Sequence, residues 1–306
     1  MTEMLTDTRS EENAQRLWPL GTFFCLAAVF AWTAWLWPIE SHGRLPLSVL
    51  GLEIKIPFLL MKLVVGNCLP GILALVWVRF EGKCQFQRLL STLTNWRTPL
   101  RWYVIVVALP CAVFFVAWSA VLFFVPVNHP PLSPSGFLTT FLMTLPFGPL
   151  WEEIAWRAFA LRKLESRFSR LASALILGLY WAVWHIPLWL LILNVNSASG
   201  VPVLLAASGN LVAWSVIWAY FYHRSSESLP VVILLHATHG AVWSQLFAAL
   251  PLPQFIYVSS ALAVCIAPFF ARGLVRIRGE HRGEIVIEET GAETKLTWGQ
   301  RSDPDR

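Results

Sequence analysis

Long apolar stretches alternate with short polar connections along most of this 306-residue chain. A helix needs about 20 mostly apolar residues to cross the ~30 Å hydrocarbon core of a bilayer. Backbone polar groups in lipid must bond within their own segment, so segments of this length are expected to be helices. The predicted fold is all-α, a polytopic membrane helical bundle of about eight transmembrane helices. The predicted spans are residues 17–37, 56–78, 103–125, 137–161, 171–193, 202–222, 229–250 and 253–274.

The composition agrees with a membrane protein. Hydrophobic residues make up 56% of the chain and charged residues 13%, whereas soluble domains carry about 25% charged residues. The five cysteines include no CxxC pair, so they are expected to fill the core and to form neither a disulfide framework nor a thiolate metal site.

Basic residues fall in alternate connections, which predicts the orientation of the chain. Connections at 126–136, 194–201 and 251–252 hold no Lys or Arg. Positively charged connections stay cytoplasmic, so a multi-pass protein of the cell membrane with both termini in the cytoplasm is predicted. The net charge of +5 therefore reflects topology, and no nucleic-acid partner is expected. The basic connections carry Arg79, Lys83, Arg88, Arg97 and Arg101, and then Arg162, Lys163, Arg167 and Arg170.

Two adjacent carboxylates and an arginine lie inside the fourth predicted span, as Glu152, Glu153 and Arg157. Ionisable groups at membrane depth are costly and indicate a functional site. Glu153 and Arg157 are four residues apart on one helix face, so we expect them to pair. Glu152 points about 100° away, which leaves it free to exchange a proton with water. The alternative is that both glutamates belong to a structural ion-pair network.

Histidines lie in two later spans. His185 follows Trp181 by one turn, and a single histidine in an aromatic helix is more often a core residue than a catalyst. His236 and His239 are three residues apart and can share a ligand or a metal ion, although helical zinc pairs more often use the four-residue spacing of HExxH, which is absent. At ~1.5 Å per residue, Glu152, His185 and His236 lie roughly 14, 21 and 10 Å from the cytoplasmic ends of their spans. All three thus fall in the inner and middle part of the bilayer, and one shared cavity is predicted.

These motifs resemble the CPBP family, the CAAX proteases and bacteriocin-processing enzymes also called the Abi family. The matching features are Glu-Glu-x-x-x-Arg at 152–157, an aromatic residue four positions before His185, and His236 on a later helix. Flanking residues at 147–150 and 184–188 are also similar to bacterial members. The resemblance covers roughly residues 65–250.

The resemblance implies an intramembrane glutamic or metallo-endopeptidase that cleaves a protein or peptide in or at the bilayer. It implies that Glu152 and His185 activate the hydrolytic water and that His236 stabilises the oxyanion. Glu153, Arg157, Trp181 and His239 would support them. No cofactor is expected, although older accounts of the family place zinc on these residues and the sequence leaves that alternative open.

Two positions depart from the family pattern. Trp181 stands where Phe is usual, a change expected to preserve an aromatic wall, and Gly240 stands where Asn is usual. The missing amide favours an alternative function, a non-catalytic membrane scaffold or immunity protein of the same family. A proton-coupled transporter is a third alternative, but the internal repeat found in many transporters is absent.

Five regions are predicted. Residues 1–16 form a cytoplasmic tail, without the features of a removable signal peptide, and residues 17–125 form the N-terminal transmembrane helices. Residues 137–250 are the catalytic core, 253–274 the last transmembrane helix, and 275–306 a cytoplasmic polar tail. Within this tail, residues 284–288 and 294–298 are expected to form a small hairpin around Gly291.

Overall fold

The computed structural model describes residues 18–36, 44–49, 52–57, 64–125, 133–193, 200–277, 285–290 and 293–298. Five described helices are long and apolar enough to cross a membrane, and a sixth apolar helix is shorter. The five are α6 (Leu100–Phe124), α10 (Arg170–Ile192), α11 (Gly200–Arg224), α12 (Leu229–Ala249) and α13 (Leu252–Arg276), and the shorter one is α2 (Trp18–Leu36). The predicted multi-pass helical bundle is confirmed, whereas the count of eight spans stays a prediction.

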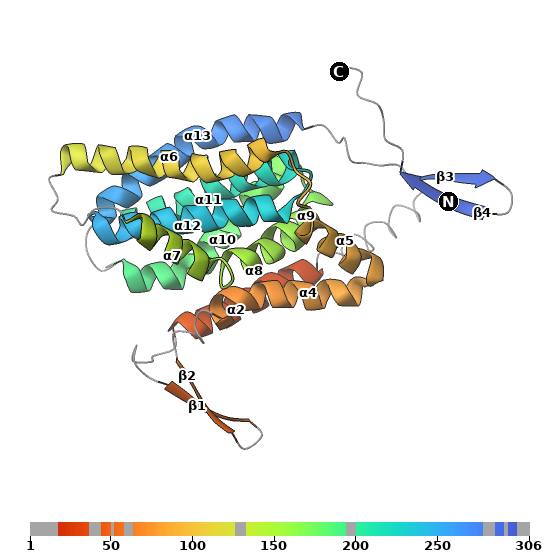
Figure 1. Cartoon of the computed structure of the whole chain (residues 1–306), viewed down its shortest axis with the longest axis horizontal. Helices are drawn as coiled ribbons and strands as arrows, with labels where there is room; N and C mark the ends of the chain where they lie inside the picture. Colours follow the sequence, from red (N-terminus) through yellow and green to blue (C-terminus); the bar gives the residue numbers. More distant parts are fainter. Residues whose placement is uncertain are drawn as a thin grey trace, which may run out of the picture.

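The long helices form the body of the bundle (Figure 1). In this view α6 and α13 lie along the top, and α2 lies along the bottom beside α4 (Leu69–Glu81). Helices α10, α11 and α12 lie between these two layers, and α11 contacts both α10 and α13. The core is therefore built from the long helices, whose apolar stretches are the easiest to recognise in the sequence.

The second predicted span, 56–78, is not one continuous helix. Strand β2 (Leu52–Pro57) ends inside it, and a π-helical turn, η1 (Val64–Cys68), leads into α4. Proline at the second position of α4 has no intrahelical hydrogen bond to lose there. After α4, Gly82 adopts a left-handed φ of 119°, which permits the turn into the short helix α5 (Lys83–Leu93).

The fourth predicted span, 137–161, is not one continuous helix. Helix α7 (Pro134–Thr144) ends in a turn at residues 145–148, and α8 (Pro149–Glu153) starts with proline at its first position. The chain then continues as a π-helix, η2 (Ile154–Leu161), and as α9 (Arg162–Glu165). All eight residues of η2 are buried. Single π-helical turns are uncommon and occur frequently at functional sites.

Two antiparallel hairpins lie outside the bundle (Figure 1). Strands β3 (Ile285–Thr290) and β4 (Glu293–Trp298) pair with Ile285 opposite Trp298, which confirms the hairpin expected in the C-terminal tail. Strand β1 (Arg44–Val49) pairs with β2. The sequence analysis did not predict this second hairpin, because its residues fall between two predicted spans.

The basic connections meet at one end of the bundle. Asn95, after α5, donates through Nδ2 to the Ser226 carbonyl at 2.9 Å in the turn between α11 and α12. Lys163 of α9 lies 2.6 Å from Glu81 at the end of α4, and His223 of α11 lies 2.7 Å from Glu165 of α9. The connections predicted to share one side of the membrane are thus in contact with one another.

Close backbone contact positions the charged turn. A Cβ atom built at Gly71 of α4 would lie 2.5 Å from the backbone oxygen of Trp151 in α8. Only glycine permits this distance, so α4 packs directly on the backbone that carries Glu152 and Glu153.

Replacement of Gly71 with alanine is expected to lower the thermal midpoint of unfolding in detergent. The added methyl group forces α4 and α8 apart, and such overpacking costs about 1–3 kcal/mol. Gly209→Ala in α11 is the matched control, because a Cβ there meets nothing within 4 Å. Alanine also favours a helix by about 1 kcal/mol over glycine, so the control midpoint should stay or rise. Equal midpoints for both variants would contradict the close contact.

Candidate active site

The charged residues of the fourth predicted span lie deep in the bundle, where α8 and η2 contact α4, α10 and α12. Glu153 and Arg157 are fully buried, and Glu152 is 6% exposed. Burial of this kind requires that each charge have a partner or a role. The surrounding hydrogen bonds show that the two neighbouring glutamates have different partners.

Glu153 is the centre of an ion-pair cluster. The Arg157 guanidinium donates from one terminal nitrogen to Glu153 Oε1 at 3.2 Å, and its Nε lies 3.2 Å from Oε2. This confirms the predicted pair. His236 of α12 places Nδ1 2.7 Å from the same Oε1, a contact the sequence analysis did not predict. The guanidinium also lies 5.5 Å from the Trp181 ring centroid and 5.2 Å from that of Trp218, within cation–π range.

Glu152 is held by two indole groups. Its Oε2 accepts hydrogen bonds from Trp156 Nε1 at 3.2 Å and from Trp181 Nε1 at 3.0 Å. The prediction that this carboxylate is free was therefore wrong, because two buried donors fix it. Trp181 is also more than an aromatic wall, since phenylalanine at this position has no N–H to donate.

The second oxygen of Glu152 lies beside a glycine. Within the described part of the chain, the hydrogen bonds to this carboxylate go to Oε2. A Cβ atom at Gly148 would lie 3.7 Å from Oε1, an ordinary contact distance, so the glycine leaves a space of about one methyl group beside this oxygen. The two indoles thus orient the carboxylate with Oε1 toward that space.

The backbone of Trp181, whose side chain binds Glu152, orients His185. Its Nδ1 lies 2.9 Å from the Trp181 carbonyl oxygen. A carbonyl only accepts, so Nδ1 carries the proton and Nε2 of the neutral ring is an acceptor. No hydrogen bond joins His185 to Glu152 among the described residues. Trp181 therefore connects the two predicted catalytic residues.

His239 lies apart from the carboxylates. Its ring packs among Phe114, Trp214 and Trp218, with centroid distances of 5.0, 4.7 and 5.2 Å. The structure does not bring this predicted supporting residue to the glutamates. At Gly240, a Cβ atom would meet nothing within 4 Å, so the position that usually carries asparagine borders open space.

A zinc ion at a catalytic site usually has three protein ligands. The Glu153 carboxylate contacts Arg157 and His236 Nδ1, and a histidine that binds zinc through Nε2 commonly has such a carboxylate at Nδ1. Across the described residues, no group of three or more His, Cys, Asp and Glu side chains is placed to hold a metal ion.

Sequence reasoning missed three residues of the site. Trp156 donates to Glu152 from four positions further along the chain, Trp218 covers the arginine, and Gly148 leaves space beside the carboxylate. The four-residue spacing between Glu152 and Trp156 is a signal that could have been used. Trp218 and Gly148 carry no comparable signal, because their roles depend on tertiary packing.

Comparison with known proteins agrees with the motifs. Residues 134–242 match a family model described as type II CAAX prenyl endopeptidase Rce1-like. A protein from Methanococcus maripaludis named CAAX prenyl protease 2 is 36% identical over 47 residues, which are 15% of this chain and 17% of that relative. The stretch 134–242 that matches the family model contains Glu152, His185 and His236. The segment 134–242 of this multi-pass membrane protein is therefore similar to the type II CAAX prenyl endopeptidases that this family model describes.

Proposed function

We propose that this protein is an intramembrane endopeptidase that hydrolyses a peptide bond of a membrane-associated protein or peptide. The observation that carries the proposal is the buried Glu152 carboxylate, which two indoles hold by one oxygen while the other borders the space at Gly148. His185 is joined to it through Trp181, whose indole donates to Glu152 and whose carbonyl oxygen lies 2.9 Å from His185 Nδ1. The family match covers these residues, and the name of the similar protein describes a CAAX prenyl protease.

In the proposed mechanism, a water molecule binds between Glu152 Oε1 and His185 Nε2. Glu152 takes a proton from this water as its oxygen attacks the scissile carbonyl carbon. The same carboxyl group then returns the proton to the leaving amine as the C–N bond breaks. General base catalysis of this kind contributes about 10²- to 10⁴-fold to a rate, and the fixed orientation of the carboxylate lowers the entropic cost of the step.

His236 is proposed to stabilise the oxyanion that forms on the substrate. Its Nδ1 faces the Glu153 carboxylate at 2.7 Å, so only Nε2 is available to donate to the substrate. That donation requires a proton on Nε2 as well as on Nδ1. A donor to an oxyanion contributes about 3–4 kcal/mol in other hydrolases.

The site is proposed to be reached from the cytoplasmic side. The basic connections that predict cytoplasmic loops are in contact at one end of the bundle, and α8 and η2 lead directly to that end through α9. Both termini would then lie in the cytoplasm.

A second candidate function is that of a non-catalytic scaffold, and Gly240 favours it. The usual asparagine amide is missing, although a Cβ atom at this position has room. A scaffold would bind its partner equally well with Glu152→Gln and would show no turnover with Gly240→Asn. An enzyme limited by the missing donor would gain turnover with Gly240→Asn.

Glu152→Gln and His185→Ala are each expected to lower cleavage of a fluorogenic peptide library by about 100-fold or more, because each removes a group that binds the water. The measurement uses purified protein in nanodiscs, with and without a chelator. Glu81→Gln, which alters only the outer ion pair with Lys163, is the control and should keep full turnover. Turnover of the wild type should also survive the chelator. Activity that persists in Glu152→Gln, or that the chelator removes, would contradict the mechanism.

Trp181→Phe is expected to lower kcat while the protein stays folded. The change keeps an aromatic ring but removes one donor to Glu152. A hydrogen bond to a charged group contributes about 1.5–3 kcal/mol, so kcat should fall about 10- to 100-fold. Trp189→Phe on the same helix is the control, because its indole nitrogen has no hydrogen-bond partner among the described residues. Equal kcat values for the two variants would show that the indole does not orient the carboxylate.

A further inference from the structure

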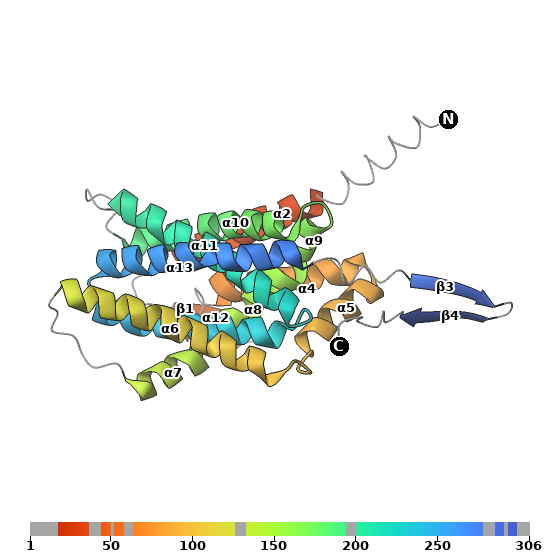
Figure 2. The same ribbon diagram turned by 90° about the horizontal axis from the view of Figure 1, so that it is seen from above.

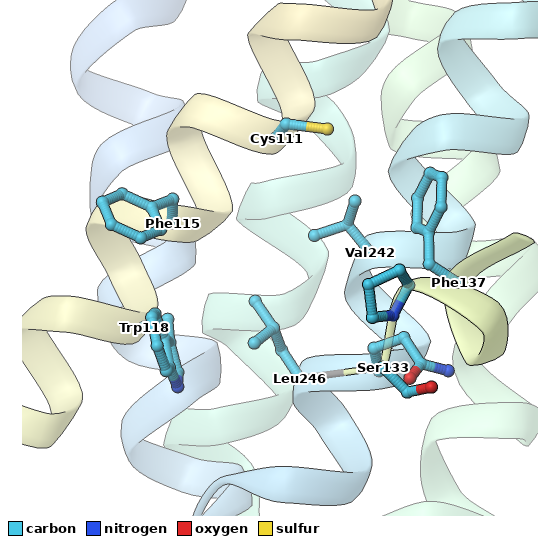
Figure 3. Close-up of a pocket in the computed structure, with 9 residues that line it drawn as sticks. Cys111, Phe115, Trp118, Ser133, Phe137, Val242 and Leu246 are labelled. Carbon is cyan, nitrogen blue, oxygen red and sulfur yellow. The ribbon is translucent and has the colours of Figure 1, made fainter. Parts of the chain in front are cut away.

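A second cavity lies between α6, α7 and α12 and has a volume of about 270 Å³. Figure 3 shows Cys111, Phe115 and Trp118 of α6 on one side, with Val242 and Leu246 of α12 facing them. Residues from the start of α7, with Ser133 and Phe137 labelled, close the remaining side. The complete lining is Cys111, Phe115, Trp118, Ser133, Pro134, Phe137, Val242, Gln245 and Leu246.

This cavity is separate from the candidate active site. Its lining includes none of the glutamates, the arginine or the histidines of that site. Along α12, Val242 follows His236 by six residues, which is about 9 Å of helix. The function proposed for the active site therefore does not account for this cavity.

The chemistry of the lining selects an uncharged apolar ligand. No charged side chain lines the cavity, and only Ser133 and Gln245 are strongly polar. Both are engaged within the protein. Gln245 donates to Thr140 Oγ1 at 3.2 Å, and Ser133 Oγ accepts from the Gly136 backbone at 3.1 Å. A polar ligand would lose its hydrogen bonds to water here without replacement.

The cavity reaches the surface that faces lipid. Phe115, which lines it, is 60% exposed, and exposed apolar side chains continue along α7 at Leu138 and Leu142. No residue of α7 is buried, and Figure 2 shows α7 at the outer edge of the bundle beside α6 and α12. Hydrocarbon chains of the bilayer therefore surround the opening.

The cavity has a polar end toward the membrane surface and an apolar end deeper in the bilayer, the same order as the head and the acyl chains of a phospholipid. Ser133 caps the start of α7 and lies toward the membrane surface at which α6 ends. Cys111 lies 13 residues before Phe124, the last residue of α6, which places it about 20 Å deeper along the helix. The volume is slightly below the range of about 300–1,000 Å³ for sites that enclose a whole small molecule. One chain of a larger amphiphile fits this description.

We propose that the cavity between α6, α7 and α12 binds one acyl chain of a membrane phospholipid, with the polar head of the lipid at the Ser133 end.

The test is photo-crosslinking in nanodiscs made with a phosphatidylcholine that carries a diazirine at the end of one acyl chain. Crosslinked peptides are mapped by mass spectrometry. The expected result is labelling concentrated around residues 111–118 and 242–246. Labelling spread evenly over other lipid-exposed helix faces, such as those of Val264 and Val275 in α13, would overturn the proposal.

Val242→Trp fills the cavity and should reduce crosslinking there by about tenfold, which corresponds to about 1.4 kcal/mol of binding. Val264→Trp, on an exposed face of α13, is the matched control and should leave it unchanged. Cys111→Phe fills the cavity from the opposite helix and replaces Val242→Trp if that variant does not fold. Unchanged labelling in a folded filled variant would overturn the proposal.

A competition experiment distinguishes a structural lipid from a lipid-modified substrate. An acylated peptide added in excess should leave the crosslinks in place. Displacement by the acylated peptide, but not by the same peptide without its chain, would assign the cavity to substrate and overturn the lipid assignment.

Discussion

The structure depends on neutralising charge inside a membrane. Glu153 and Arg157 are fully buried, and an unpaired charge at such depth costs several kcal/mol. The pair they form is completed by His236 of α12 and by the faces of Trp181 and Trp218. Because these partners come from α10, α11 and α12, the cluster fixes the broken fourth segment to the three helices of the core.

The same cluster gives two adjacent glutamates different roles. Glu153 meets the Arg157 guanidinium, whereas Glu152 meets only neutral indole donors at one of its oxygens. Trp156 and Arg157 each follow one of the two carboxylates by four residues, a spacing that brings side chains together on one helix face. Among the described residues, no cation therefore pairs directly with the Glu152 carboxyl group. That difference is the physical basis for assigning it the reactive role.

Much of this arrangement follows from local rules. Apolar length located α6 and α10 to α13, and four-residue spacing identified the Glu153–Arg157 pair. The bonds from Trp156 and Trp181 to Glu152 were not predicted, because side-chain rotamers decide where an indole N–H points. The contact between His236 and Glu153 depends on how α12 packs against α8, which one sequence does not specify. The hydrophobic pattern of residues 56–78 also gives no clear sign that the helix is interrupted within this segment.

The most direct test compares Glu152→Gln with Glu153→Gln for both turnover and thermal unfolding in the same detergent. Glutamine at 152 still accepts the two indole hydrogen bonds, so this variant should lose turnover and keep its unfolding midpoint. Glutamine at 153 leaves Arg157 buried without its counter-charge, which costs about 3–5 kcal/mol, so that midpoint should fall sharply. A Glu152→Gln protein that retains turnover, or two variants that are equally destabilised, would contradict the division of roles between the two glutamates.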